Sequence, residues 1–207
     1  MSRLRYNRKH AVDFLKTSCP QIACLIREKG AFQLQIRQSS DLFTSLASSI
    51  VYQQLSGKAA ATIYGRFTAL FANNIPEATD AVNFSVQTLR SVGLSNNKAL
   101  AITDLAEHSC SGSLPNARKM ASMDDDAVIR SLCRVRGIGP WTAQMYLMFS
   151  LGRADVMPAT DLGIQKGVQL VYKLPVLPAP DQVLETTQHL APYRSIASWY
   201  FWRAVDD

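Results

Sequence analysis

The sequence predicts an all-α protein, and three observations support this. Apolar residues recur at spacings of three and four along nearly the whole chain, which is the period of an amphipathic helix. The alternation of apolar and polar residues that is typical of a β-strand is short and scarce. The chain has 207 residues, of which 47% are hydrophobic. It can therefore bury a core as one domain or as two small lobes.

Turn and capping residues divide this pattern into separate helices. Gly30, Gly93 and a proline-rich linker at 175–180 mark helix ends. A helix is also expected to start at the acidic triplet 124–126, because the positive end of the helix dipole favours carboxylates. The other expected helices cover residues 11–28, 39–54, 57–71, 85–91, 96–108, 141–150, 162–172, 181–190 and 193–205.

Composition narrows the class of partner. Lys and Arg exceed Asp and Glu by six, and the isoelectric point is about 9.3, which favours a polyanionic partner. The four cysteines form no CxxC pair and have no histidine at zinc-finger spacing, which argues against a structural zinc site. The basic start leads into no apolar segment of membrane length. We therefore expect no membrane partner and an intracellular protein.

The most informative segment is 132–149, LCRVRGIGPWTAQMYLMF. It predicts the end of one helix, a tight turn at 137–139, and a second helix that Pro140 opens in its first turn. The two glycines of the turn permit a positive φ and a close backbone approach to a partner. Amide groups at the start of the second helix could bind a phosphate, beside Arg134 and Arg136. An ordinary helix turn is the alternative.

The longer string around this turn resembles the helix-hairpin-helix motif of the DNA glycosylase superfamily that includes the 3-methyladenine glycosylases and endonuclease III. The resemblance implies two small helical lobes that flank a DNA-binding cleft, without an extra β domain. It implies a single domain over 1–207, with a central lobe at about 39–150 and a second lobe from 1–38 and 151–207. By the match, the DNA-binding residues of the hairpin are Gly137, Ile138, Gly139, Thr142 and Arg136.

The resemblance also bears on cofactors. Members of the superfamily hold a monovalent cation on carbonyl oxygens of the hairpin. By the match, these carbonyls belong to Cys133, Val135 and Ile138 in this chain, and the ion would be Na⁺ or K⁺. The activity that the resemblance implies requires no cofactor.

Asp161 is the candidate catalytic residue. It follows a proline-containing loop and stands at the start of a predicted helix, where an isolated aspartate is typical of an N-cap. That capping role is the alternative. The segment 158–164, PATDLGI, resembles the PxxDLGI pattern of the alkylbase-specific branch, which implies that Asp161 faces the flipped nucleotide. A carboxylate suits this role because it stabilises an oxocarbenium-like sugar cation. The branch often carries a second acid where this chain has Thr160.

Two absences from the sequence indicate a monofunctional enzyme. Bifunctional members of the superfamily have a Schiff-base lysine just after the hairpin, and this chain has Trp141 at that position. Without an amine nucleophile there, strand cleavage through a covalent imine is not expected. The four-cysteine cluster of endonuclease III is also missing, because no cysteine follows Cys133.

A second DNA-contacting segment is expected at 48–67. It resembles the loop between two helices that family members push into the minor groove when a base is flipped. Lys58 would reach a phosphate. A polar turn between two core helices is the alternative for this segment. The candidate minor-groove wedge residues are Gln54, Leu55 and Ser56.

Aromatic side chains are the candidates for the base pocket. A purine that carries a delocalised positive charge gains stacking and cation-π energy on aromatic faces, and a normal purine does not. Trp141, Met145 and Trp202 are the expected lining residues. Trp202 lies in a segment that resembles the closing helix of the alkyladenine branch. Its neighbours Trp199 and Tyr200 are assigned to the core.

These features together predict a monofunctional DNA glycosylase that removes 3-methyladenine, 7-methylguanine or related bases in base excision repair. The expected partner is double-stranded DNA with alkylated bases or abasic sites, and the expected state is a monomer. The expected compartment is the nucleus in a eukaryote, and otherwise the cytoplasm or nucleoid. One alternative is a catalytically weak homologue that binds abasic or distorted DNA. Another is a structural DNA-binding protein without a base pocket.

Overall fold

A computed structural model describes residues 4, 6–36 and 41–206. All regular elements in this part of the chain are helices, so the all-α prediction is confirmed. The chain forms two compact units. Unit 1 contains Met1–Arg37 and Leu147–Asp207, and unit 2 contains Gln38–Tyr146. The helix Pro140–Phe149, α10, contains the boundary between the two units.

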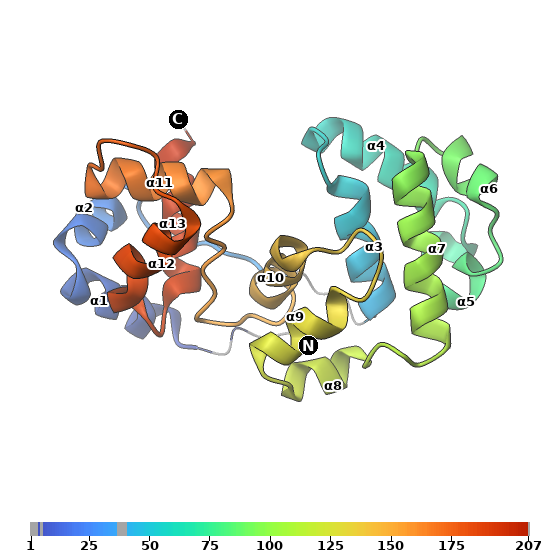
Figure 1. Cartoon of the computed structure of the whole chain (residues 1–207), viewed down its shortest axis with the longest axis horizontal. Helices are drawn as coiled ribbons and strands as arrows, with labels where there is room; N and C mark the ends of the chain where they lie inside the picture. Colours follow the sequence, from blue (N-terminus) through green and yellow to red (C-terminus); the bar gives the residue numbers. More distant parts are fainter. Residues whose placement is uncertain (1–3, 5, 37–40, 207) are drawn as a thin grey trace. The chain divides into compact units, whose positions relative to one another are not determined.

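Unit 1 is built from the two ends of the chain. In Figure 1 its first two helices, in blue, lie beside the orange and red C-terminal helices, and α2 contacts both α11 and α13. The buried side chains Leu15, Ile22, Ile164, Val168 and Phe201 belong to one hydrophobic cluster. The helices of unit 1 are α1 (Arg8–Ser18), α2 (Pro20–Lys29), α11 (Leu162–Tyr172), α12 (Pro180–Thr187), η2 (Gln188–Leu190) and α13 (Arg194–Val205).

The contact between α11 and α13 is the most extensive one between helices of unit 1. A glycine makes this close packing possible. A Cβ atom at Gly167 would lie 2.8 Å from the carbonyl carbon of Phe201, and it would overlap the carbonyl oxygen. The backbone of α13 therefore occupies the space that any side chain at this position of α11 would need.

Unit 2 surrounds α7, which contacts α3, α5 and α6. Figure 1 shows α7 in green beside α3 in cyan. The core of unit 2 includes the fully buried side chains Phe43, Ile50, Phe67, Ile102 and Leu105. The helices of unit 2 are α3 (Leu42–Tyr52), α4 (Gly57–Thr68), η1 (Ala72–Asn74), α5 (Ala78–Ala81), α6 (Val86–Ser91), α7 (Asn96–Cys110), α8 (Ala117–Ser122) and α9 (Asp125–Leu132).

Several predicted boundaries differ from the structure. The expected helix 11–28 is two helices, because Pro20 cannot donate the hydrogen bond of a helix interior and instead opens α2. The short helices α5 and α8 were not expected, since neither is long enough to show a clear helical period. The start of the expected helix 39–54 lies partly outside the described residues. The acidic triplet was predicted correctly, with Asp124 as the N-cap of α9.

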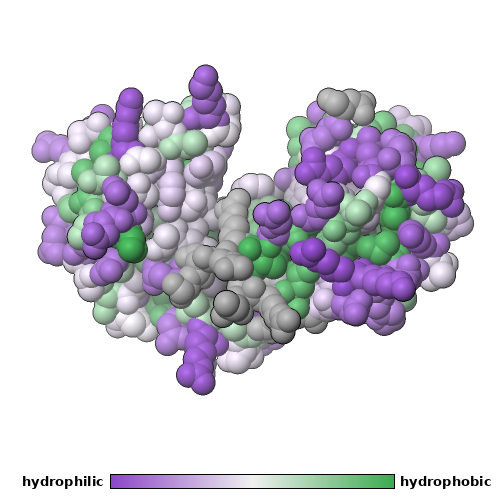
Figure 2. Space-filling view, turned by 180° about the vertical axis from the view of Figure 1, so that it is seen from behind, coloured by the Kyte–Doolittle hydropathy of each residue, from purple (hydrophilic) through white to green (hydrophobic). Residues whose placement is uncertain are grey.

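The surface is mixed in character. On the face drawn in Figure 2, hydrophilic side chains are spread over both units, with smaller groups of hydrophobic side chains between them. No described helix combines the length and apolar character that crossing a bilayer requires.

We predict that Gly167→Ala destabilises the protein by about 1–3 kcal/mol, because the added methyl group overlaps the backbone of α13 and that backbone must shift. The midpoint of urea unfolding, followed by circular dichroism at 222 nm in the far ultraviolet, measures this effect.

The matched control is Gly65→Ala. Gly65 lies on the exposed side of α4, and a Cβ there would meet no described side chain within 4 Å. Its replacement should raise stability by up to about 1 kcal/mol, because alanine is the better helix former. Equal effects of the two substitutions would contradict the proposed close contact between α11 and α13.

Candidate functional site

The predicted hairpin lies in unit 2. Helix α9 ends at Leu132 and α10 begins at Pro140, as the sequence predicts. Gly137 has a left-handed φ of 76°, and a Cβ atom there would lie 3.1 Å from the Cβ of Ala101 on α7. Gly139 is different, because its φ lies outside the left-handed range and its Cβ would meet no described atom within 4 Å. Only Gly137 is therefore required by the turn geometry.

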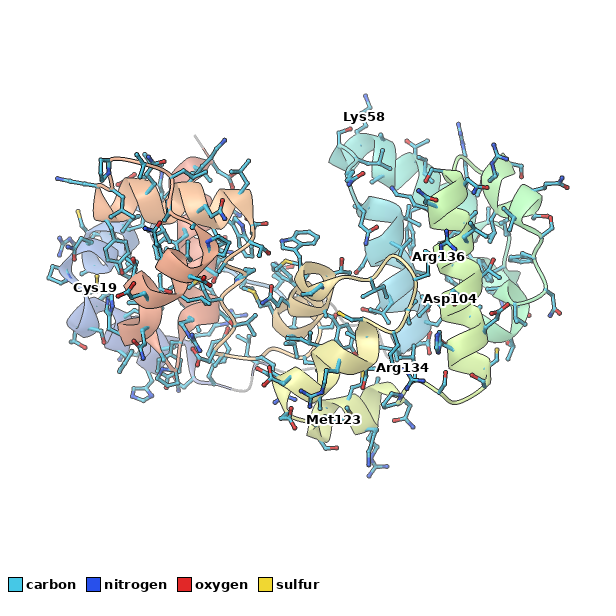
Figure 3. All side chains as sticks on the ribbon, viewed as in Figure 1. Cys19, Lys58, Asp104, Met123, Arg134 and Arg136 are labelled. Carbon is cyan, nitrogen blue, oxygen red and sulfur yellow. The ribbon has the colours of Figure 1, made fainter. Side chains whose placement is uncertain are left out.

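Helix α7 and the loop that follows it also hold the hairpin by polar contacts. The carboxylate of Asp104 accepts a hydrogen bond of 2.7 Å from the backbone amide of Arg136, and Figure 3 shows the two residues side by side. His108 lies 3.8 Å from the same carboxylate. The guanidinium of Arg134 donates to the carbonyl of Ser113 at 3.3 Å. The side chain of Arg136 itself is exposed to solvent.

A side chain at the end of α3 also contacts the hairpin. The amide nitrogen of Gln53 donates to the carbonyl of Gly137 at 3.0 Å and to the hydroxyl of Thr142 at 3.2 Å. Thr142 is only 5% exposed. The structure thus brings the predicted hairpin residues together with a residue that directly precedes the predicted wedge.

The candidate wedge residues lie in the α3–α4 loop and are exposed. Gln54 has a left-handed φ of 56°, and 38% of Leu55 is exposed. Ser56 caps α4 by accepting a bond from the amide of Ala59. Lys58 is exposed and extends from the first turn of α4 (Figure 3). The loop therefore presents polar and apolar side chains to the solvent.

Lys98, in the first turn of α7, fixes the start of this loop. Its ammonium group donates to the carbonyls of Val51 and Gln53 at 2.8 and 2.7 Å. Burial lowers the pKa of Lys98 from its ordinary value. The two carbonyls at the C-terminal end of α3 act in the opposite direction, since they hydrogen-bond the charged form.

Asp161 lies in unit 1 as the N-cap of α11. Its Oδ1 atom accepts a hydrogen bond of 2.9 Å from the backbone amide of Ile164. The same oxygen accepts a second bond of 2.9 Å from the indole nitrogen of Trp202 on α13. The capping role that sequence reasoning kept as the alternative is thus present. A carboxylate held by two donors has a fixed orientation, which a catalytic group also needs.

Gly163 makes room for this arrangement. A Cβ atom there would lie 2.9 Å from Cδ1 of Trp202 and 3.0 Å from Oδ1 of Asp161. On another side, the ring of Phe149 stacks on Trp202, with centroids 6.0 Å apart and an interplanar angle of 25°. Trp202 is therefore packed between a glycine and an aromatic ring while it donates to the carboxylate.

The loop before Asp161 is tied to α13. The guanidinium of Arg194 forms two hydrogen bonds with the carboxylate of Asp155, at 2.7 and 2.8 Å, and this contact raises the pKa of Arg194. The hydroxyl of Ser195 accepts a bond from the amide of Val156, and that of Ser198 donates to the carbonyl of Val156. The segment that leads into the candidate catalytic residue is thus anchored at both backbone and side chain.

Trp202 is one of the three candidate pocket residues. The other two lie on α10, in the part of that helix that belongs to unit 2. Trp141 is 40% exposed, and Met145 is half-buried. Tyr146 is buried, and burial raises its pKa to about 12.

On α13, Tyr200 is fully buried in the core of unit 1, as expected. Trp199 is partly buried and packs against the same core.

The carbonyls expected to bind a cation lie in the turn between α9 and α10. That of Val135 accepts a hydrogen bond of 3.1 Å from the amide of Ile138, and a carbonyl oxygen has a second lone pair. Burial raises the pKa of the Cys133 thiol. In residues 4, 6–36 and 41–206, no three His, Cys, Asp or Glu side chains gather in a way that could hold a metal.

Sequence reasoning missed four residues that organise these sites: Gln53, Lys98, Asp104 and Gly163. The two glycines of α11, four residues apart, were a usable signal, because such a pair lies on one helix face and permits close packing. Gln53 directly precedes the predicted wedge. Lys98 and Asp104 gave no local signal, since their partners are brought near only by the fold.

Known proteins resemble this chain over most of its length. DNA-3-methyladenine glycosylase 1 of Schizosaccharomyces pombe is 33% identical over 167 residues, which are 80% of this chain and 73% of that protein. A structure of the 3-methyladenine DNA glycosylase Mag1 of the same yeast with abasic DNA has a TM-score of 0.85 and 30% identity, covering 94% of this chain and 95% of that one. A DNA-3-methyladenine glycosidase structure from Bacillus halodurans gives 0.83 and 34%, covering 94% and 88%.

A family match supports the same assignment. It covers residues 47–192, which is well over half of the chain. The matched region includes the hairpin turn at 137–139, the α3–α4 loop and Asp161, whereas Trp202 follows it. The chain belongs to the HhH-GPD superfamily of base excision DNA repair proteins.

Proposed function

We propose that this protein is a monofunctional DNA glycosylase that excises alkylated purines, such as 3-methyladenine and 7-methylguanine, from double-stranded DNA. The observation that carries the proposal is the carboxylate of Asp161, which Ile164 and Trp202 hold in one orientation at the start of α11. The named glycosylases among its relatives support the same activity. We further propose that the protein acts as a monomer, in the nucleus of a eukaryote or otherwise in the cytoplasm or nucleoid.

The proposed chemistry needs one well-placed negative charge. The bond between C1′ of the sugar and the nitrogen of the base breaks, and the base leaves with the electron pair. The sugar then carries an oxocarbenium-like positive charge, which the carboxylate of Asp161 stabilises. A water molecule adds its oxygen to C1′ and loses a proton to the carboxylate or to solvent. The products are the free base and an abasic site.

An alkylated purine suits a site with this single acid. The alkyl group leaves a positive charge on the base, so the base departs as a neutral molecule and needs little help from a general acid. Aromatic faces discriminate such a base from a normal purine through stacking and cation-π energy. We assign this stacking role to Trp141 and Trp202, and Met145 is proposed to line the wall of the pocket. Because the position after the hairpin holds Trp141 and not lysine, no covalent imine forms there.

Duplex binding is assigned to unit 2. The hairpin residues Gly137, Ile138 and Gly139 offer backbone groups to a phosphate, and the exposed Arg136 and Lys58 add positive charge. Extruding a nucleotide costs a few kcal/mol of lost stacking and pairing. The wedge candidates Gln54, Leu55 and Ser56 fill the gap that the nucleotide leaves.

We extend the proposal to a monovalent cation at the hairpin. Carbonyl oxygens are ligands that such an ion accepts, and those of Cys133, Val135 and Ile138 would hold it. A bound Na⁺ or K⁺ would add positive charge close to the phosphate contact. The excision step itself uses no cofactor.

The test of the proposal is base release from methylated duplex DNA. We predict that the unaltered protein releases methylated purines and that Asp161→Asn lowers the single-turnover rate by about a hundredfold or more, because the cation loses its counter-charge. Asn still caps a helix, so the fold should be retained. Binding of the variant to an abasic-site duplex should be equal or tighter, since a negative charge near phosphates is removed.

The control for this substitution is Asp124→Asn. Asp124 is also an N-cap aspartate, and its carboxylate accepts the amide of Ala127 in the same way. Its replacement should leave base release unchanged. Release by Asp161→Asn at a rate within a few-fold of normal would refute the catalytic role. Tight binding to abasic DNA without release by the unaltered protein would favour the alternative of a damage-binding homologue.

A second prediction concerns the hydrogen bond from Trp202. Trp202→Phe keeps an aromatic ring but removes the donor to Asp161. We expect the single-turnover rate of base release to fall at least about tenfold, because a hydrogen bond to a charged group contributes roughly 1.5–3 kcal/mol. Affinity for an abasic-site duplex should change much less, which a fluorescence anisotropy titration measures.

Trp199→Phe is the matched control on the same helix. Trp199 contacts Phe32, Tyr200 and Arg203. Its replacement should affect stability but not the rate of release at saturating protein. If both tryptophan variants slow release equally, the effect is one of packing in α13 and the orienting role of Trp202 is wrong.

A further inference from the structure

The contacts of Gln53 join two elements that the proposed function uses on the same duplex. Its side-chain amide donates to the carbonyl of Gly137 and to the hydroxyl of Thr142. One acceptor belongs to the hairpin turn and the other to the first turn of α10. A single side chain thus bridges the turn and the helix N-terminus where the phosphate contact is assigned.

The backbone of Gln53 is held as firmly as its side chain. Its carbonyl accepts a hydrogen bond of 2.7 Å from Lys98, which also holds the carbonyl of Val51. The next residue, Gln54, has a left-handed φ of 56°. That conformation is uncommon for a residue with a Cβ atom and persists where the surroundings impose it. The anchored backbone before Gln54 supplies such surroundings.

We propose that Gln53 is a positioning residue for damage recognition, which ties the α3–α4 loop to the hairpin so that wedge and phosphate contact engage the duplex in one register. This inference rests on the proposed function, because it assumes that the loop enters the minor groove. Lys98 shares this role, because it holds the backbone at the start of the same loop.

The physical reason for this role is preorganisation of the α3–α4 loop. A wedge fills the gap in the base stack only if it reaches the groove at a fixed offset from the phosphate that the hairpin binds. A loop that is free to move must be ordered at the moment of binding, and this ordering weakens affinity for the distorted duplex. Binding to intact duplex depends mainly on phosphate contacts and does not require the wedge. Loss of Gln53 should therefore affect the preference for damage more than the binding to DNA.

The experiment compares two duplexes of the same sequence, one intact and one with a tetrahydrofuran abasic analogue. A 2-aminopurine next to the analogue reports unstacking when the wedge inserts. The unaltered protein should prefer the abasic duplex and increase the 2-aminopurine fluorescence. Gln53→Ala should lower that preference about tenfold, which corresponds to 1.4 kcal/mol of lost coupling, and should reduce the fluorescence increase at saturation.

Two controls separate positioning from a general loss of structure. Gln87→Ala removes an exposed glutamine from α6 in the same unit and should change neither readout. The salt dependence of intact-duplex binding by Gln53→Ala should match that of the unaltered protein, because no phosphate contact is lost. A merely destabilised variant would lose binding to both duplexes together.

Lys98→Met tests whether Lys98 shares the positioning role of Gln53. If Lys98 acts through the α3–α4 loop, its replacement lowers the preference for the abasic duplex and leaves the salt slope unchanged. A slope that falls by about one unit would show instead that Lys98 contacts a phosphate directly, and this would overturn its assigned role.

The outcomes distinguish the inference from the function on which it rests. If the unaltered protein prefers the abasic duplex and Gln53→Ala retains both the preference and the fluorescence increase, the positioning role is wrong. If the unaltered protein itself shows no preference, both the damage-recognition function and the positioning role fail. Base release takes no part in these readouts, so a failure of the enzymatic proposal is detected separately.

Discussion

The close approach of α13 to α11 is the constraint on which the candidate catalytic centre depends. Gly163 and Gly167 lie four residues apart on one face of α11, and each leaves space that α13 fills. At Gly167 the occupant is the backbone at Phe201, and at Gly163 it is the indole of Trp202. Because of this packing, the indole reaches Oδ1 of Asp161. Asp161 is therefore both the N-cap of α11 and a carboxylate of fixed orientation.

In unit 2, helix α7 supports the hairpin and the α3–α4 loop in a corresponding way. Three positions at intervals of three residues along this helix hold the proposed DNA-contacting elements. Lys98 binds the carbonyls at the end of α3, Ala101 lies against Gly137, and Asp104 accepts the amide of Arg136. Neither the hairpin nor the α3–α4 loop is a free surface loop. Both are fixed to the most central helix of the unit, which suits a surface that must match the rigid geometry of a duplex.

The sequence allowed the helical class, most helix ends and the hairpin to be predicted, because these depend on local signals. The helix break at Pro20 was missed because the apolar period continues across it. The sequence also predicted Asp161 at a helix start. It could not predict what fixes that carboxylate, since Trp202 is 41 positions away. Gln53 and Gly137 are 84 positions apart. Such pairings arise from tertiary packing, and only the spacing of the two glycines in α11 hinted at one of them.

The central claim is that the carboxylate of Asp161 faces the positive charge that develops on the sugar. The most direct measurement compares affinities for two abasic analogues, a cationic pyrrolidine and a neutral tetrahydrofuran of the same shape. We expect the unaltered protein to prefer the cationic analogue by tenfold or more, about 1.4 kcal/mol. Asp161→Asn should lose this preference. An equal preference in both proteins would contradict the role of Asp161, because the attraction would then come from another group.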